Sequence, residues 1–128
     1  MNEALDTPTA LLGAARQLIE GQVAGTSGAW PRASALLARQ ALEEEVRSLW
    51  DGPYEAARSC SATHQLLCSR VVLGEQLASE AFQVWAALSQ ACHVHAYELG
   101  PVAAELHGWI NAVERVVERV VERVVEAR

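Results

Sequence analysis

The stretch Trp85–Trp109 reads WAALSQACHVHAYELGPVAAELHGW, and the break inside it decides how the second half of the chain folds. That break is Gly100-Pro101, because the residue before a proline avoids helical backbone angles. We therefore predict one helix from about Glu75 that ends between residues 93 and 100, and another helix that Pro101 opens. The stretch also holds two of the four tryptophans and three of the four histidines, which marks it as a candidate site.

Three further helices are indicated in the first half of the chain. Thr7 and Pro8 suit the N-cap and the first position of a helix over residues 7–21. Glycine-containing segments precede and separate two more helices, over residues 31–50 and 53–74. Each segment places apolar residues three and four positions apart, which builds one apolar helical face. The sequence thus predicts an all-α, single-domain bundle of about five helices with a long C-terminal helix.

Composition favours helix and limits the classes of function. Alanine and leucine are abundant, phenylalanine occurs once, and the net charge is −6 without any lysine. The acidic body has no basic patch of the kind that binds nucleic acid non-specifically, and the acidic run at residues 43–45 is predicted to be a solvent-exposed helix face. The N-terminus lacks the basic start of a secretory signal, and no run approaches the ~18 apolar residues of a membrane span. We expect a cytoplasmic protein without membrane contact.

The chain ends in an internal repeat, VERV-VERV-VERV-VEAR, that begins at Val113. We predict a helical bundle domain over residues 1–112 and an amphipathic helical extension over residues 113–128 that continues the last helix. A four-residue period exceeds the 3.6 residues of a helical turn, so the valine stripe drifts by about 40° per repeat. The stripe either packs along its own domain or meets a partner or a second copy. The second alternative assigns oligomerisation to Val113, Val116, Val117, Val120, Val121 and Val124.

Arg58 and His64 form the spacing Arg-x5-His. A ribonuclease that works near neutral pH can use a histidine as acid or base and an arginine to hold the phosphate. Six residues along an ideal helix separate the two side chains by about 120°, so a shared site needs a kink or a partner chain. The two residues are candidate catalytic residues, and the alternative is a surface arginine beside a core histidine.

Cys60, His64 and Cys68 lie four residues apart along the chain. Two ligands one helical turn apart can share a metal ion, but three such positions drift around the helix, and structural zinc usually draws its ligands from loops. The three cysteines show no Cys-x-x-Cys spacing, and in a reducing compartment they are most simply small buried hydrophobic residues. We therefore predict no metal ion and no cofactor.

Histidine and tyrosine side chains precede the break at Gly100. One interpretation is structural, because these side chains can satisfy the exposed carbonyls at the end of the preceding helix. The other is that they contact a ligand or RNA. The candidate binding residues of this region are Trp85, His93, His95, Tyr97 and Trp109.

Two blocks carry a resemblance to known proteins: ARQALEEEV at residues 38–46 and ALSQACHVHAYELGPVAAELHGWI at residues 87–110. They are similar to small actinobacterial helical proteins. More distantly, the pattern resembles the HEPN superfamily, whose bundles carry a late histidine near a kink, as at His93. This resemblance implies a dimeric bundle, often in toxin–antitoxin or phage-defence systems. Some members are metal-independent ribonucleases with an Arg-x4-6-His motif at the dimer interface, and others are inactive and bind a partner protein.

Arg58 and His64 match the spacing of that motif, but they fall on the predicted third helix, whereas the resemblance places the motif on a late helix. No arginine precedes His93 at that spacing. We therefore predict a HEPN-like binding or regulatory module that forms a homodimer and binds a protein partner. One alternative is a metal-independent endoribonuclease that uses Arg58 and His64, the one case in which RNA is a partner. The other is a structural dimerisation protein.

Overall fold

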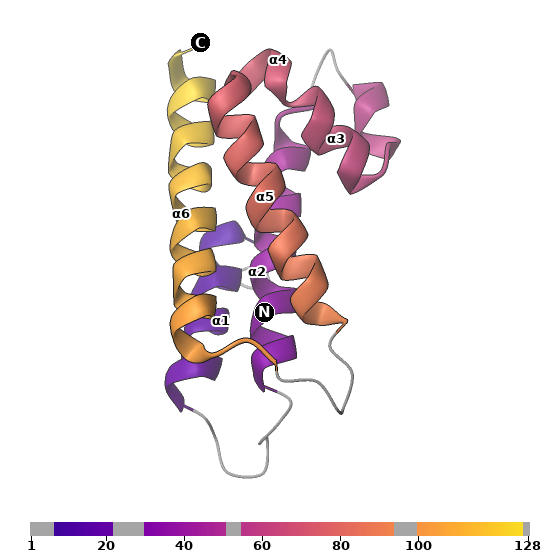
Figure 1. The fold of residues 1–128 in the computed structure, drawn as a ribbon. Helices are drawn as coiled ribbons and strands as arrows, with labels where there is room; N and C mark the ends of the chain where they lie inside the picture. The colour runs from indigo at the N-terminus through magenta and orange to yellow at the C-terminus, as the bar shows by residue number, and fades with distance from the viewer. Residues whose placement is uncertain (1–6, 22–29, 51–54, 94–99, 127–128) are drawn as a thin grey trace.

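The computed structural model describes residues 7–21, 30–50, 55–93 and 100–126. These residues form a bundle of helices, drawn in Figure 1, and contain no strand. The elements are α1 (Pro8–Gly21), α2 (Trp30–Ser48), the 3₁₀ helix η2 (Glu55–Ser59), α3 (Ala62–Cys68), α4 (Arg70–Leu73), α5 (Glu75–Cys92) and α6 (Ala103–Glu126). The predicted all-α bundle with a long C-terminal helix is confirmed, and α6 passes residue 112 without a break.

Four long helices, α1, α2, α5 and α6, make up the body of the bundle, and α3 and α4 lie at one end of it (Figure 1). α2 is the central helix, because it contacts α1, α3, α5 and α6. α5 and α6 contact each other and run in opposite directions. The C-terminal part of α6 therefore lies beside α4, where Nη1 of Arg123 donates a hydrogen bond to the Val72 carbonyl at 3.4 Å.

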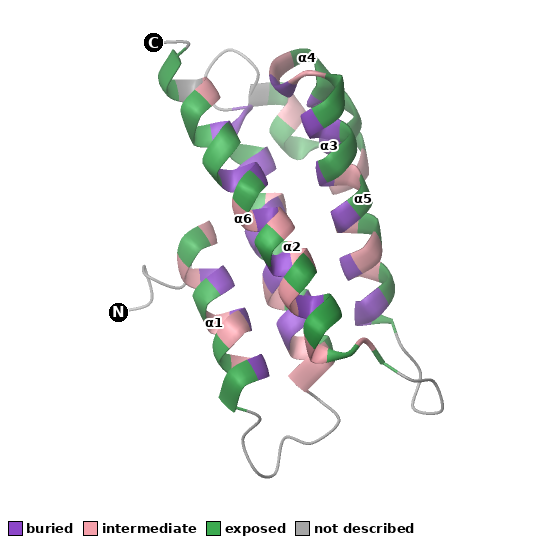
Figure 2. Ribbon diagram, turned by 60° about the vertical axis from the view of Figure 1, so that its left-hand side comes forward, coloured by how far each residue is buried: buried purple, intermediate pink, exposed green. Residues whose placement is uncertain are grey.

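Small side chains line the contact between α1 and α2. Ser34 on α2 is buried, and its hydroxyl donates a hydrogen bond to the Ala15 carbonyl of α1 at 3.1 Å. Helix axes come as near as about 8 Å only where the contacting side chains are small. Figure 2 shows that the buried residues lie on the inward faces of the long helices. The fully buried alanines of the core are Ala15, Ala35, Ala38, Ala41 and Ala81.

The predicted start of α1 is confirmed, and α6 starts two residues later than predicted. The hydroxyl of Thr7 accepts a hydrogen bond from the Ala10 amide at 3.2 Å, which is the N-cap predicted for α1. At the other break, α6 begins at Ala103, two residues after Pro101. The Val102 amide donates to the Glu105 carboxylate at 3.1 Å, so this glutamate satisfies a backbone donor that the helix leaves unpaired.

The predicted third helix over residues 53–74 is wrong as a continuous helix, because η2, α3 and α4 replace it. The hydroxyl of Ser61 accepts a hydrogen bond from the His64 amide at 3.3 Å and so starts a new helix. The side-chain amide of Gln65 donates to the Arg58 and Cys60 carbonyls, each at 3.0 Å, and fixes the bend before α3. The hydroxyl of Ser69 bonds the Leu66 carbonyl between α3 and α4. Such side-chain bonds to the backbone compete with helix continuation.

The drift of the valine stripe is visible in the burial of α6. Along one row of the repeat the exposed fraction rises from 0% at Val113 to 8% at Val117, 50% at Val121 and 65% at Val125. The row rotates out of the core because each four-residue step overshoots one helical turn. The second row enters the core at Val116 and Val120, which are 1% and 0% exposed. The early part of the repeat therefore packs on its own bundle, and its last turns carry valine at the surface.

Two neighbouring valines test this rotation. Val120→Ala should lower the free energy of unfolding by about 1–2 kcal/mol, because it removes buried methyl groups and leaves a cavity, although alanine is the better helix former. Val121→Ala should change it by less than about 0.5 kcal/mol, since half of that side chain is already exposed. Urea unfolding of both variants measures the difference. Equal losses at the two positions would show that the stripe packs in another register.

Candidate functional site

A polar cluster crosses the contact between α2 and α5. The indole nitrogen of Trp85 donates a hydrogen bond to the Glu43 carboxylate at 3.0 Å, and Nε of Arg39 lies 3.5 Å from the same oxygen. About two helical turns further along both helices, Nε of Arg32 donates to the Cys92 carbonyl at 3.1 Å, at the end of α5. These contacts join α2 to α5 along their length, so the predicted binding residue Trp85 serves helix packing in this structure.

The acidic run at residues 43–45 is not one solvent-exposed face, contrary to the prediction. Only Glu44 is exposed, and it lies 3.4 Å from Arg47. Glu43 is partly buried against Trp85, and Glu45 is buried. Burial raises the pKa of the Glu45 carboxyl because the charged form loses hydration. Residue spacing placed Glu45 on the same side of α2 as the apolar Ala41 and Leu42, which was the missed signal.

Arg58 and His64, the predicted catalytic pair, lie on separate elements, η2 and α3, with exposed side chains. The bend held by Gln65 thus replaces the ideal helix on which they would point about 120° apart. Nδ1 of His64 lies 3.2 Å from the Ser61 hydroxyl, so one ring nitrogen is held by the helix start. The chain therefore bends between the two residues, and both are exposed.

The cysteines differ in their surroundings. Cys60 and Cys68 are exposed, so the prediction that all three are buried hydrophobic residues is wrong for these two. Cys92 is buried, and burial raises the pKa of its thiol, an increase that the positive charges of Arg39 and Arg32 partly offset. A raised thiol pKa keeps Cys92 protonated and poorly nucleophilic. Among the described residues there is no group of three or more histidine, cysteine or acidic side chains that could hold a metal ion.

Of the other predicted binding residues, the structure describes His93 at the end of α5 and Trp109 in α6. His93 is the exposed C-cap of α5, and its amide donates to the Gln90 carbonyl at 3.1 Å. Trp109 is partly buried against the core from α6. His95 and Tyr97 lie outside the described residues. The structure thus places His93 at the end of α5, where its backbone amide bonds a carbonyl. The contact that the structural interpretation assigned to its side chain stays a prediction.

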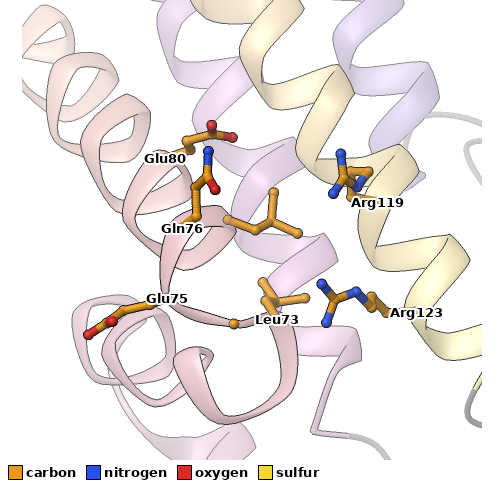
Figure 3. Close-up of a pocket in the computed structure, with 8 residues that line it drawn as sticks. Leu73, Glu75, Gln76, Glu80, Arg119 and Arg123 are labelled. Atoms are coloured by element: carbon orange, nitrogen blue, oxygen red, sulfur yellow. The ribbon is translucent and has the colours of Figure 1, made fainter.

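A pocket of about 260 Å³ lies between α5 and the C-terminal part of α6 (Figure 3). Arg119 and Arg123 form one wall, and Gln76 and Glu80 extend from α5 on the other side. Arg123 also bonds the Val72 carbonyl, so it ties α4 to α6. The lining of the pocket as a whole carries both positive and negative side chains. Such a lining suits a structural contact between helices or a small polar molecule rather than one strongly charged ligand.

A second pocket, of about 270 Å³, lies between α3 and α5 and is mostly apolar. Its lining includes Leu67, which is 50% exposed. Val71, four residues further along the chain, is 89% exposed. The residues that line the pocket are Leu66, Leu67, Arg70, Glu75, Ala78, Ser79 and Phe82. The sequence did not indicate this surface, because the predicted continuous third helix counted Leu67 and Val71 as part of its buried stripe.

The chain matches no protein-family model, no curated protein and no solved structure. None of the described helices is long and apolar enough to cross a membrane.

Glu45 provides a pH test of the α2 packing. Its folded-state pKa is raised, so the folded protein binds the proton more tightly than the unfolded chain does, and stability falls as pH rises through the folded-state pKa. Glu45→Gln should therefore stabilise the protein at pH 7, and the gain should shrink towards pH 4, where the wild-type carboxyl is protonated. Glu44→Gln, at an exposed neighbour, is the matched control and should show no such gain. Urea unfolding at both pH values measures it, and a gain that persists unchanged at pH 4 would contradict the burial of Glu45.

Proposed function

We propose that the chain is a helical binding and regulatory module that acts through contact with another protein at its α3–α4 surface. We define this surface as His64, Leu67, Cys68 and Val71, which follow one another at i, i+3, i+4 and i+7 and are all exposed. A surface helix normally turns its apolar stripe towards the core and its polar residues outward. Here Leu67 and Val71 point outward, and this is the observation that carries the proposal.

The charge around the α3–α4 surface indicates the chemistry of its partner. Residues 56–74 contain Arg58, Arg70 and His64 but no acidic residue, in a chain whose net charge is −6. Arg70 also lines the apolar pocket beside this surface, and Glu75, at the start of α5, lines the same pocket. An apolar surface with a basic margin suits an amphipathic helix that carries acidic residues, because opposite charges steer and orient the encounter.

The resemblance to HEPN proteins gives this module a biological setting. We propose that it works in the cytoplasm within a toxin–antitoxin or phage-defence system, where a HEPN-like chain without activity binds a partner protein. The helical bundle is compatible with this setting. Under this proposal the partner is encoded by a gene next to its own.

The alternative proposal is a metal-independent endoribonuclease that uses Arg58 and His64. The observation in its favour is that both side chains are exposed on adjoining elements, with the imidazole held by Ser61 at 3.2 Å. The histidine would move the proton and the arginine would hold the phosphate. RNA cleavage by the purified protein that persists in chelator and disappears in His64→Ala would replace the binding proposal with this one.

The binding proposal is tested by co-expressing the chain with the products of its neighbouring genes. We expect one product to co-purify and Leu67→Glu/Val71→Glu to weaken its binding by at least about tenfold, since the change puts charge into an apolar contact. The matched control is Val102→Glu, which places the same charge at an exposed valine directly before α6. Binding that survives the double substitution, or is lost equally in the control, would contradict the proposal.

A further inference from the structure

A second exposed stripe lies on the last turns of α6 and has the same spacing as the α3–α4 surface. We call it the tail stripe and define it as Glu118, Val121, Glu122 and Val125, again at i, i+3, i+4 and i+7. Val121 and Val125 are 50% and 65% exposed, and both glutamates are exposed. The tail stripe exists because the repeat rotates these valines out of the core. The tail stripe spans about 10 Å at 1.5 Å per residue. Together with the α3–α4 surface, it leaves two groups of apolar side chains uncovered in one chain.

The two stripes are complementary in charge. The tail stripe carries two carboxylates beside its valines, whereas the α3–α4 surface contains no acid and is bordered by the cationic Arg70. The acid nearest to Val71 along the chain is Glu75, at the start of α5. Glu122 is 3.9 Å from Arg119 in an exposed ion pair, which is a weak interaction that a second chain can replace. Two tail stripes against each other would instead bring carboxylates together, so charge favours the unlike pairing.

One chain cannot join its own two stripes. Arg119 and Arg123 of α6 line the pocket that faces α5, and Arg123 bonds α4. Val121 lies two positions from each of them, and residues two positions apart on a helix point about 160° apart. The tail stripe therefore points away from the side on which α3 and α4 lie, and Figure 2 shows α6 extending past the start of α1. The two stripes are available only to other molecules.

We infer that the tail stripe of one copy docks on the α3–α4 surface of another copy. This inference rests on the proposed function, because it uses the same binding surface and names the occupant of that surface when no other partner is bound. The contact pairs unlike surfaces, so it is heterologous and leaves one free stripe of each kind in a pair. A partner protein that binds the α3–α4 surface then competes with self-association, which makes assembly the regulated step.

Two variants with complementary defects test the pairing by sedimentation. Leu67→Glu/Val71→Glu removes the docking surface, and Val121→Glu/Val125→Glu removes the tail stripe. We expect the wild-type protein to associate as its concentration rises, and less so at high salt, because the contact is partly electrostatic. Each variant alone should stay at the 13.8 kDa mass of one chain. An equal mixture should form a species of twice that mass and no larger, since only one intact contact remains.

Circular dichroism of both variants and of the Val102→Glu control establishes that they fold, and the control should associate as the wild type does. A wild type that stays monomeric, a variant that still associates alone, or a mixture that stays monomeric would each overturn the inference. One variant that associates alone while the other stays monomeric would identify a contact between like surfaces. Should self-association fail while a neighbouring gene product still requires Leu67 and Val71, only this inference falls and the proposed function stands.

Discussion

The close contact around α2 is the constraint on which the rest of the structure depends. Ala35, Ala38 and Ala41 are completely buried on this helix. Ala15 of α1 and Ala81 of α5 are also completely buried, and both of these helices contact α2. A side chain of even a few more atoms would force these helices apart, which typically costs about 1–3 kcal/mol in a packed core. With α2 held in the centre, α5 and α6 have fixed neighbours, and α3 and α4 remain at the end of the bundle, where few helices are available to cover them.

Much of the fold could be predicted because it depends on local signals. The break at Gly100-Pro101, the N-cap at Thr7 and the drift of the valine repeat follow from backbone restriction and helix geometry. The bend in the third helix was not predicted, because it depends on hydrogen bonds from the Gln65 side chain to the backbone carbonyls of Arg58 and Cys60. The partial burial of Glu43 was not predicted, because its hydrogen-bond partner is Trp85, which lies on another helix and 42 residues away in the sequence.

The proposed binding surface lies outside the stretch Trp85–Trp109. Of the residues in Trp85–Trp109, Trp85 packs α5 on α2 and His93 ends α5, so both have structural roles. The exposed apolar residues lie at two other places. Leu67 lies in the segment where the predicted third helix is broken, and Val121 lies near the end of the four-residue repeat, whose period does not match the helical turn. Both surfaces follow from the same limit: a small bundle cannot cover every apolar residue its helices carry.

The tail stripe of one copy and the α3–α4 surface of another copy bind each other. Amide hydrogen exchange of the wild-type chain, measured at one dilute and one concentrated protein sample, tests it most directly. Exchange should slow with concentration in two segments, residues 64–71 and 118–125, and should be unchanged in α1 and in the first half of α2. Slowing at α1 or α2 instead, or equal exchange in both samples throughout the chain, would contradict it.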